Sequence, residues 1–103
     1  MTNISDYKNG DAIDLIADII EPITNIMQDE SIRKNFMTED KRVYAIKQAL
    51  KSHKSDILEI LARLDGVEVK DLNYTPISLV TKCVQILSDK ELTDFFSYVA
   101  ETE

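Results

Sequence analysis

Apolar residues in this chain recur at intervals of three and four positions, and that spacing constrains the fold more than any other feature. Between Asp11 and Met27 they cover most of a helical surface and leave one polar stripe. Shorter segments repeat the spacing at 32–36, 43–50, 57–64, 77–87 and 92–99. One brief alternation of apolar and charged residues, at 67–72, is too short for an independent sheet. The sequence therefore predicts an all-α protein.

Capping residues and helix breakers indicate where the helices start and stop. Ser55 is expected to cap one helix and Gly66 to end it. Thr75-Pro76 predicts another start, because proline suits the first helical position, and Ser88–Glu91 has the form of a capping box. Pro22 lies inside the first apolar pattern and removes a backbone donor, so we expect a kinked helix there.

Length and composition set the domain organisation. The 103 residues include only two glycines and two prolines, which fits one compact domain. We expect a single-domain bundle of five or six short helices over residues 1–103, with 1–10 and 100–103 flexible. Six positions on the expected inward faces are predicted to be core, namely Ile57, Leu61, Val80, Val84, Phe95 and Phe96.

Charge is unevenly distributed along the chain. The net charge is −7, so duplex nucleic acid and anionic membranes are unfavourable partners. Residues 1–40 carry −6 and residues 65–103 carry −5, whereas 41–64 carry +4. The basic segment either docks an acidic partner or attracts the acidic flanks within the fold, and we expect the second, because mixed charge is typical of a solvated surface.

The residues that could carry catalysis or hold a metal are few. His53 is the single imidazole and Cys83 the single thiol, so neither a zinc site nor a disulfide can form within one chain. No glycine-rich phosphate loop is present. We expect no catalytic residues, no metal, no cofactor and no enzyme activity. The absence of a secretory pattern and of a long apolar run, together with a lone thiol, favours the cytoplasm.

Apolar residues exceed what one small core needs, most clearly at Ile13–Met27 and Leu92–Tyr98. Surplus apolar surface is often a protein interface, although the first helix could instead be central and buried all round. The candidate partner-binding residues on these two segments are Ile16, Ile20, Ile23, Phe95 and Phe96.

Several helix faces and turn residues carry a likeness to one family. They comprise the run from His53 to Ala62, the turn Leu64-Asp65-Gly66-Val67 with Leu72 after it, and Pro76–Leu79, Ile86–Asp89 and Glu91–Phe96 near the end of the sequence. With the acidic first helix, this pattern resembles the small tail assembly chaperones of long-tailed phages and prophages of Gram-positive bacteria. The likeness spans about residues 12 to 96 and contains no catalytic signature.

The resemblance implies a non-enzymatic protein made in the cytoplasm of the bacterial host cell, which binds the tape-measure protein during tail assembly. A tail-tube partner, a homo-oligomer and a frameshifted longer product stay open. The alternative is an acidic regulatory or inhibitor protein that occupies a basic surface of a host protein, which the net charge favours and the basic middle segment does not. An enzyme of unknown type is the third hypothesis.

Overall fold

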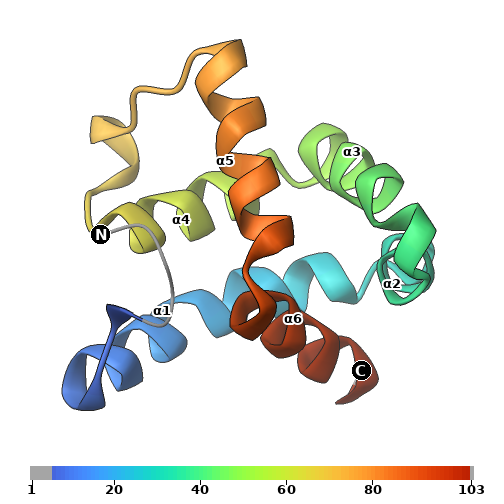
Figure 1. The fold of residues 1–103 in the computed structure, drawn as a ribbon, viewed down its shortest axis with the longest axis horizontal. Coiled ribbons are helices and arrows are strands. Elements are labelled where there is room, and N and C mark those ends of the chain that lie inside the picture. Colours follow the sequence, from blue (N-terminus) through green and yellow to red (C-terminus); the bar gives the residue numbers. More distant parts are fainter. Residues whose placement is uncertain (1–5, 103) are drawn as a thin grey trace.

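The computed structural model describes residues 6–102 and confirms the all-α fold. This part of the chain forms six α-helices and no strand (Figure 1). The helices are α1 (Asn9–Met27), α2 (Glu30–Met37), α3 (Arg42–Ser52), α4 (Lys54–Asp65), α5 (Pro76–Ser88) and α6 (Lys90–Thr102). Two short 3-10 turns, η2 (Glu39–Lys41) and η3 (Val69–Asp71), precede α3 and α5.

Helices extend into both terminal segments for which the sequence predicts flexibility, at 9–10 and at 100–102. α1 already begins at Asn9, and α6 extends to Thr102 with Ala100 buried. Residues 1–5 and 103, which belong to the same prediction, lie outside the described residues. α1 also runs without interruption through Pro22, which is itself buried.

The helix caps differ in part from those predicted. Thr75 caps α5, since the Ser78 N–H donates to the Thr75 Oγ1 at 3.2 Å. In return, the Thr75 N–H donates to the Ser78 Oγ at 2.8 Å. α6 is capped by Asp89, one residue later than predicted, through the Leu92 N–H at 3.2 Å. α4 starts at Lys54, so Ser55 is inside the helix.

The hydrophobic core is built by five of the helices. α1 contributes one long face and the other helices contribute shorter ones, and the rings of Phe36 and Phe96 meet at a centroid distance of 5.8 Å. α1 is not buried all round, because Ile13 is 70% exposed. The core residues are Leu15, Ile19, Ile23, Ile26, Met27, Ile32, Phe36, Ala45, Ala49, Ile60, Leu64, Leu92, Phe96, Val99 and Ala100. Among the described residues, none of these comes from α5.

Two of the six predicted core positions are on the surface. Leu61 and Phe96 are buried, and Ile57 and Phe95 are half-buried, but Val80 and Val84 on α5 are 62% and 58% exposed. The prediction of a buried Val80–Val84 stripe is therefore wrong. The reason is the rotation of α5 about its own axis, which turns a different side of the helix toward the protein.

Candidate functional site

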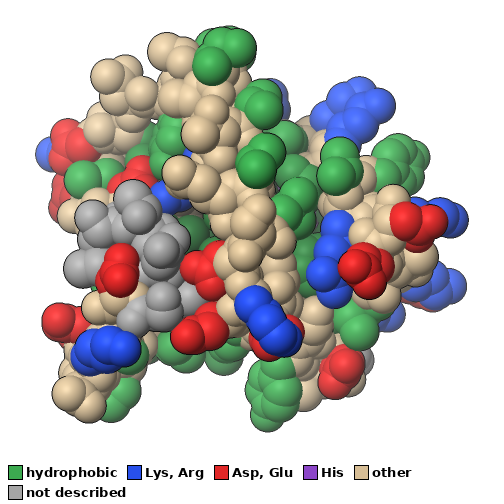
Figure 2. Space-filling model, viewed as in Figure 1, with side chains coloured by type: hydrophobic (Ala, Val, Ile, Leu, Met, Phe, Trp, Pro, Cys, Tyr) green, Lys and Arg blue, Asp and Glu red, His purple; other side chains and the backbone are tan. Residues whose placement is uncertain are grey.

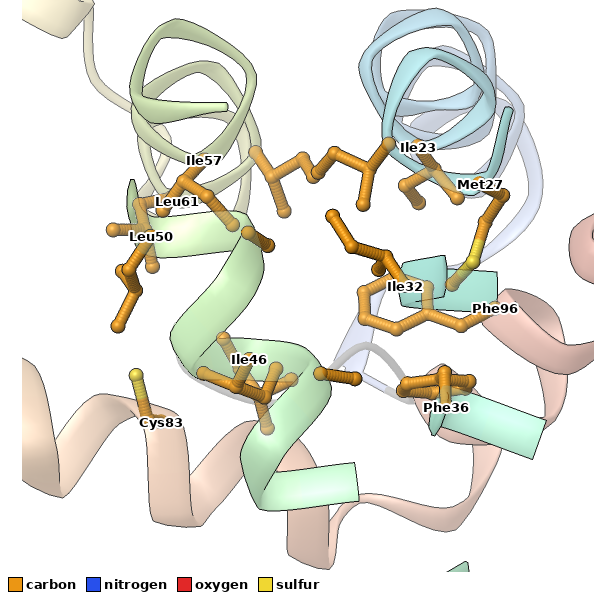
Figure 3. A pocket seen from close by; sticks show the side chains of 15 residues that line it. Ile23, Met27, Ile32, Phe36, Ile46, Leu50, Ile57, Leu61, Cys83 and Phe96 are labelled. Atoms are coloured by element: carbon orange, nitrogen blue, oxygen red, sulfur yellow. The ribbon is translucent and has the colours of Figure 1, made fainter. Parts of the chain in front are cut away.

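An apolar cavity lies under α5. Its volume is about 60 Å³, and all fifteen side chains around it are apolar (Figure 3). They come from all six helices and are Ile23, Ile26, Met27, Ile32, Phe36, Ala45, Ile46, Ala49, Leu50, Ile57, Ile60, Leu61, Cys83, Ile86 and Phe96. With no polar group to hold an ordered water, such a cavity suits apolar side chains.

The cavity lies between a wall on α3 and a wall on α5. Cys83 points from α5 toward the side where Ile46 and Leu50 project from α3 (Figure 3). These lining residues, with Ile86, are only half-buried, so solvent reaches the cavity on this side. We call the cavity and its two walls the α5–α3 groove.

The apolar surface continues outward from the groove. Ile77, Val80 and Val84 of α5 are 79%, 62% and 58% exposed, and Val43 of α3 is 71% exposed. Figure 2 shows hydrophobic side chains along the edge of α5 that faces α3. Single exposed apolar residues are ordinary, whereas a contiguous row beside an apolar cavity is typical of an interaction site.

The side of α5 that faces the protein is held by an ion pair between Lys82 and Asp65, which we call the anchor. In α5, all of whose residues are described, Lys82 alone is buried, and its Nζ lies 2.9 Å from Asp65 Oδ1 at the end of α4. The Tyr74 hydroxyl donates to Asp65 Oδ2 at 2.6 Å. Burial, together with this hydrogen bond and the Asp65 charge, raises the pKa of Tyr74. The anchor fixes the rotation of α5 and leaves the Val80–Val84 face outside.

The lysines of the basic segment form no ion pair with any residue that the structure describes. Among residues 6–102, no carboxylate lies within ion-pair distance of Lys41, Lys47, Lys51 or Lys54. Elsewhere the pairs Lys34–Glu30, Lys70–Glu68, Lys82–Asp65 and Lys90–Asp94 form. The expected attraction between these lysines and the acidic flanks is thus not made through direct ion pairs among the described residues.

His53 and Cys83, the two residues considered for catalysis, lie in surroundings typical of a structural role. The His53 ring lies 3.4 Å from Asp56 Oδ2 and 3.7 Å from Asp29 Oδ2, where α3 meets α4. Burial raises the pKa of the Cys83 thiol, which disfavours the reactive thiolate. Within the described residues, no group of three or more His, Cys, Asp or Glu side chains could hold a metal ion. None of the described helices is long and apolar enough to cross a membrane.

A second hollow differs from the groove in its chemistry. It has a volume of about 310 Å³ and lies beside α1, where its lining includes the carboxylates of Asp11, Asp14 and Asp18. The Tyr7 hydroxyl, at its edge, donates to the Leu64 carbonyl at 3.0 Å. This hollow is wide, and its lining mixes acidic side chains and Arg63 with the apolar Leu15 and Val67, whereas the lining of the groove is apolar throughout.

The five candidate residues from the sequence fall in different places. Ile23 and Phe96 are 1% and 7% exposed and belong to the lining of the cavity. Ile16 and Phe95 are half-buried against the core, and Ile20 is 44% exposed; none of these three lines the cavity. The exposed face of α5, with Ile77, Val80 and Val84, is not among these candidates. One feature of the sequence could have pointed to this face: Lys82 is the single charged residue in that 13-residue helix.

Comparison with protein-family models, with curated proteins and with solved structures gave no match for this chain.

Proposed function

We propose that this protein is a non-enzymatic chaperone that binds an amphipathic helix of a larger protein in the α5–α3 groove. The observation that carries the proposal is the exposed apolar face of α5 beside an apolar cavity. A helix that lays its apolar side into such a groove is a recurring mode of peptide recognition. The two walls are themselves helices, so a third helix packed between them would complete the layer.

The free energy for binding comes from apolar burial. Ile77, Val80, Val84 and Val43 are each more than half exposed in the free protein. Full burial of a side chain of this size contributes roughly 1.5 to 3 kcal/mol. Ordering of the partner opposes this gain, but a preformed groove keeps that opposing term small on the side of the chaperone.

The partner that we propose is the tape-measure protein of a long-tailed phage or prophage of a Gram-positive host, with the tail-tube protein as a second client. Support comes from the resemblance carried by His53–Ala62 and by the segments around α5 and α6. The apolar stripes of a long helical protein must be shielded from water until the protein is assembled. A groove with one open side can bind and shield such a stripe. The net charge of −7 would keep the coated copies apart in the cytoplasm of the host.

A second candidate function is the acidic inhibitor. The observation that favours it is the row Asp11, Asp14 and Asp18 beside the second hollow. Binding through these carboxylates would weaken steeply as salt rises, whereas binding through apolar contacts in the groove depends on salt only weakly.

Co-expression with the tape-measure protein tests the proposal. We expect the wild-type protein to bring the tape-measure protein into the soluble fraction and to co-purify with it across rising salt. The double variant Val80→Asp/Val84→Asp should lose this activity, because two charges would enter the apolar face. The matched control is Thr81→Asp/Gln85→Asp, which adds the same charges to another exposed side of α5.

Circular dichroism would first establish that both variants keep their helices, which the exposure of all four positions favours. Two results would contradict the proposal. One is a tape-measure protein that stays insoluble and unbound with the wild-type chaperone at every salt concentration. The other is equal binding by the two double variants.

A further inference from the structure

The two walls of the α5–α3 groove differ in charge. α3 carries Lys47 and Lys51 directly after the lining residues Ile46 and Leu50. Each residue advances about 100° around a helix, so the order from the cavity to the solvent is Ile46, Leu50, Val43, Lys47, Lys51. The two lysines therefore border the outer edge of the α3 wall, and both are exposed.

These lysines have no partner in the described part of the chain, although the protein as a whole has 19 acidic and 12 basic residues. The α5 wall, in contrast, presents no charge at all. Its single charged residue, Lys82, is turned inward and paired with Asp65 at 2.9 Å. The groove thus has one basic edge and one neutral edge.

We infer that the groove selects an amphipathic helix that carries carboxylates along one edge, and that this acidic edge lies against α3. The inference rests on the proposed function and specifies the chemistry of its partner. Apolar side chains of the bound helix would contact the cavity, Val43 and the face of α5. Carboxylates on one flank would pair with Lys47 and Lys51, which fixes how the helix is rotated in the groove.

The dimensions of the groove limit the length and spacing of the partner segment. α3 has 11 residues and α5 has 13, which correspond to helices of about 16 and 20 Å. A segment of three to four turns therefore spans the walls. Lys47 and Lys51 are four residues apart, one turn along α3, so acidic residues at i and i+4 or i and i+3 of the partner match their separation.

Two helical peptides of about 14 residues test the inference. Both carry the same leucine stripe, and one has Glu whereas the other has Lys at two positions one turn apart on the same flank. By fluorescence anisotropy at low salt, the Glu peptide should bind the wild-type protein about tenfold more tightly than the Lys peptide. Raising the salt concentration should narrow this difference, because exposed ion pairs are screened.

Charge reversal on the protein gives the matched comparison. In the variant Lys47→Glu/Lys51→Glu the preference should reverse, so that the Lys peptide binds more tightly. The control Lys8→Glu/Lys70→Glu changes the net charge equally at two exposed positions outside the lining of the groove, and it should keep the preference for Glu.

Equal affinity of the two peptides for the wild-type protein would overturn the inference, as would an unchanged preference in Lys47→Glu/Lys51→Glu. So would a wild-type dimer in sedimentation that Val80→Asp/Val84→Asp converts to a monomer, because a second copy would then be the occupant. Loss of the charge preference alone leaves the proposed function intact, because tape-measure binding that depends on Val80 and Val84 would persist.

Discussion

α4 and α5 have nearly the same length and the same apolar spacing, yet they use it in opposite ways. In α4, Ile60, Leu61 and Leu64 are buried. In α5, the equivalent stripe holds Ile77, Val80 and Val84, all more than half exposed, and the buried residue is a lysine. A shared pattern of apolar residues therefore does not fix which side of a helix faces the core.

A polar contact accounts for the difference between these helices. α5 has a second apolar row, Leu79, Cys83 and Ile86, which is half-buried on the side next to Lys82. The ion pair with Asp65 selects this side, because a buried ammonium group needs its carboxylate partner. The first row is then left exposed to solvent, whereas in α4 the stripe with Ile60, Leu61 and Leu64 is the one that is buried.

The largest expected effect compares one residue from each helix. Leu61→Ala in α4 should lower the free energy of unfolding by about 2 to 5 kcal/mol, because it removes buried methyl groups. Val84→Ala in α5 should change it by less than about 0.5 kcal/mol, because Val84 is already exposed to water. Urea denaturation of both variants measures the contrast. A large loss for Val84→Ala would show that the α5 stripe is part of the core.

The anchor of α5 gives the next effect in size. Lys82→Met should lower the free energy of unfolding by about 1.5 to 3 kcal/mol, the range for a hydrogen bond to a charged group. The double variant Lys82→Met/Asp65→Asn should lose less than the sum of the two single variants, since both remove the same contact. Strictly additive losses would mean that the two groups do not stabilise α5 together.

The smallest effect is a dependence of stability on alkaline pH. The folded state raises the pKa of Tyr74 above its usual value near 10, so the neutral phenol is the favoured form. This contribution is fully present below about pH 10 and is lost as pH rises through the folded pKa, because the unfolded chain ionises first. Tyr74→Phe should therefore lose less stability than the wild type between pH 9 and 11 in urea titrations. Parallel curves would contradict this role of Tyr74.

Most of the fold follows from local signals in the sequence. The apolar spacing predicts the helices, and the Thr75 cap and the stop at Gly66 agree with the structure. Apart from the side of α5 that is buried, the errors are single-residue choices between neighbouring caps, such as Ser88 against Asp89. These side chains compete for the same backbone donors, and the three-dimensional geometry decides between them.

The candidate site is much harder to predict. The groove depends on a contact between Asp65 and Lys82, 17 residues apart, which no periodicity encodes. Counting apolar residues locates a surplus on α1 and α6 but cannot tell exposed positions from buried ones. Ile23 and Phe96 are therefore candidate partner-binding residues by their sequence pattern, although both are buried beneath the groove, where Phe96 agrees with its second prediction as a core position.

The most direct test of the central claim, that a partner helix occupies the α5–α3 groove, uses Cys83 as a reporter. Cys83 is the one cysteine of the chain and lines the cavity, so its alkylation by a maleimide reports access to the groove. A soluble helical segment of the tape-measure protein at ten times its Kd should slow the reaction to about one tenth, the fraction of protein left unbound. Val80→Asp/Val84→Asp should show no protection at the same concentration. An unchanged alkylation rate in a complex that has demonstrably formed would contradict the account, because the partner would then bind elsewhere.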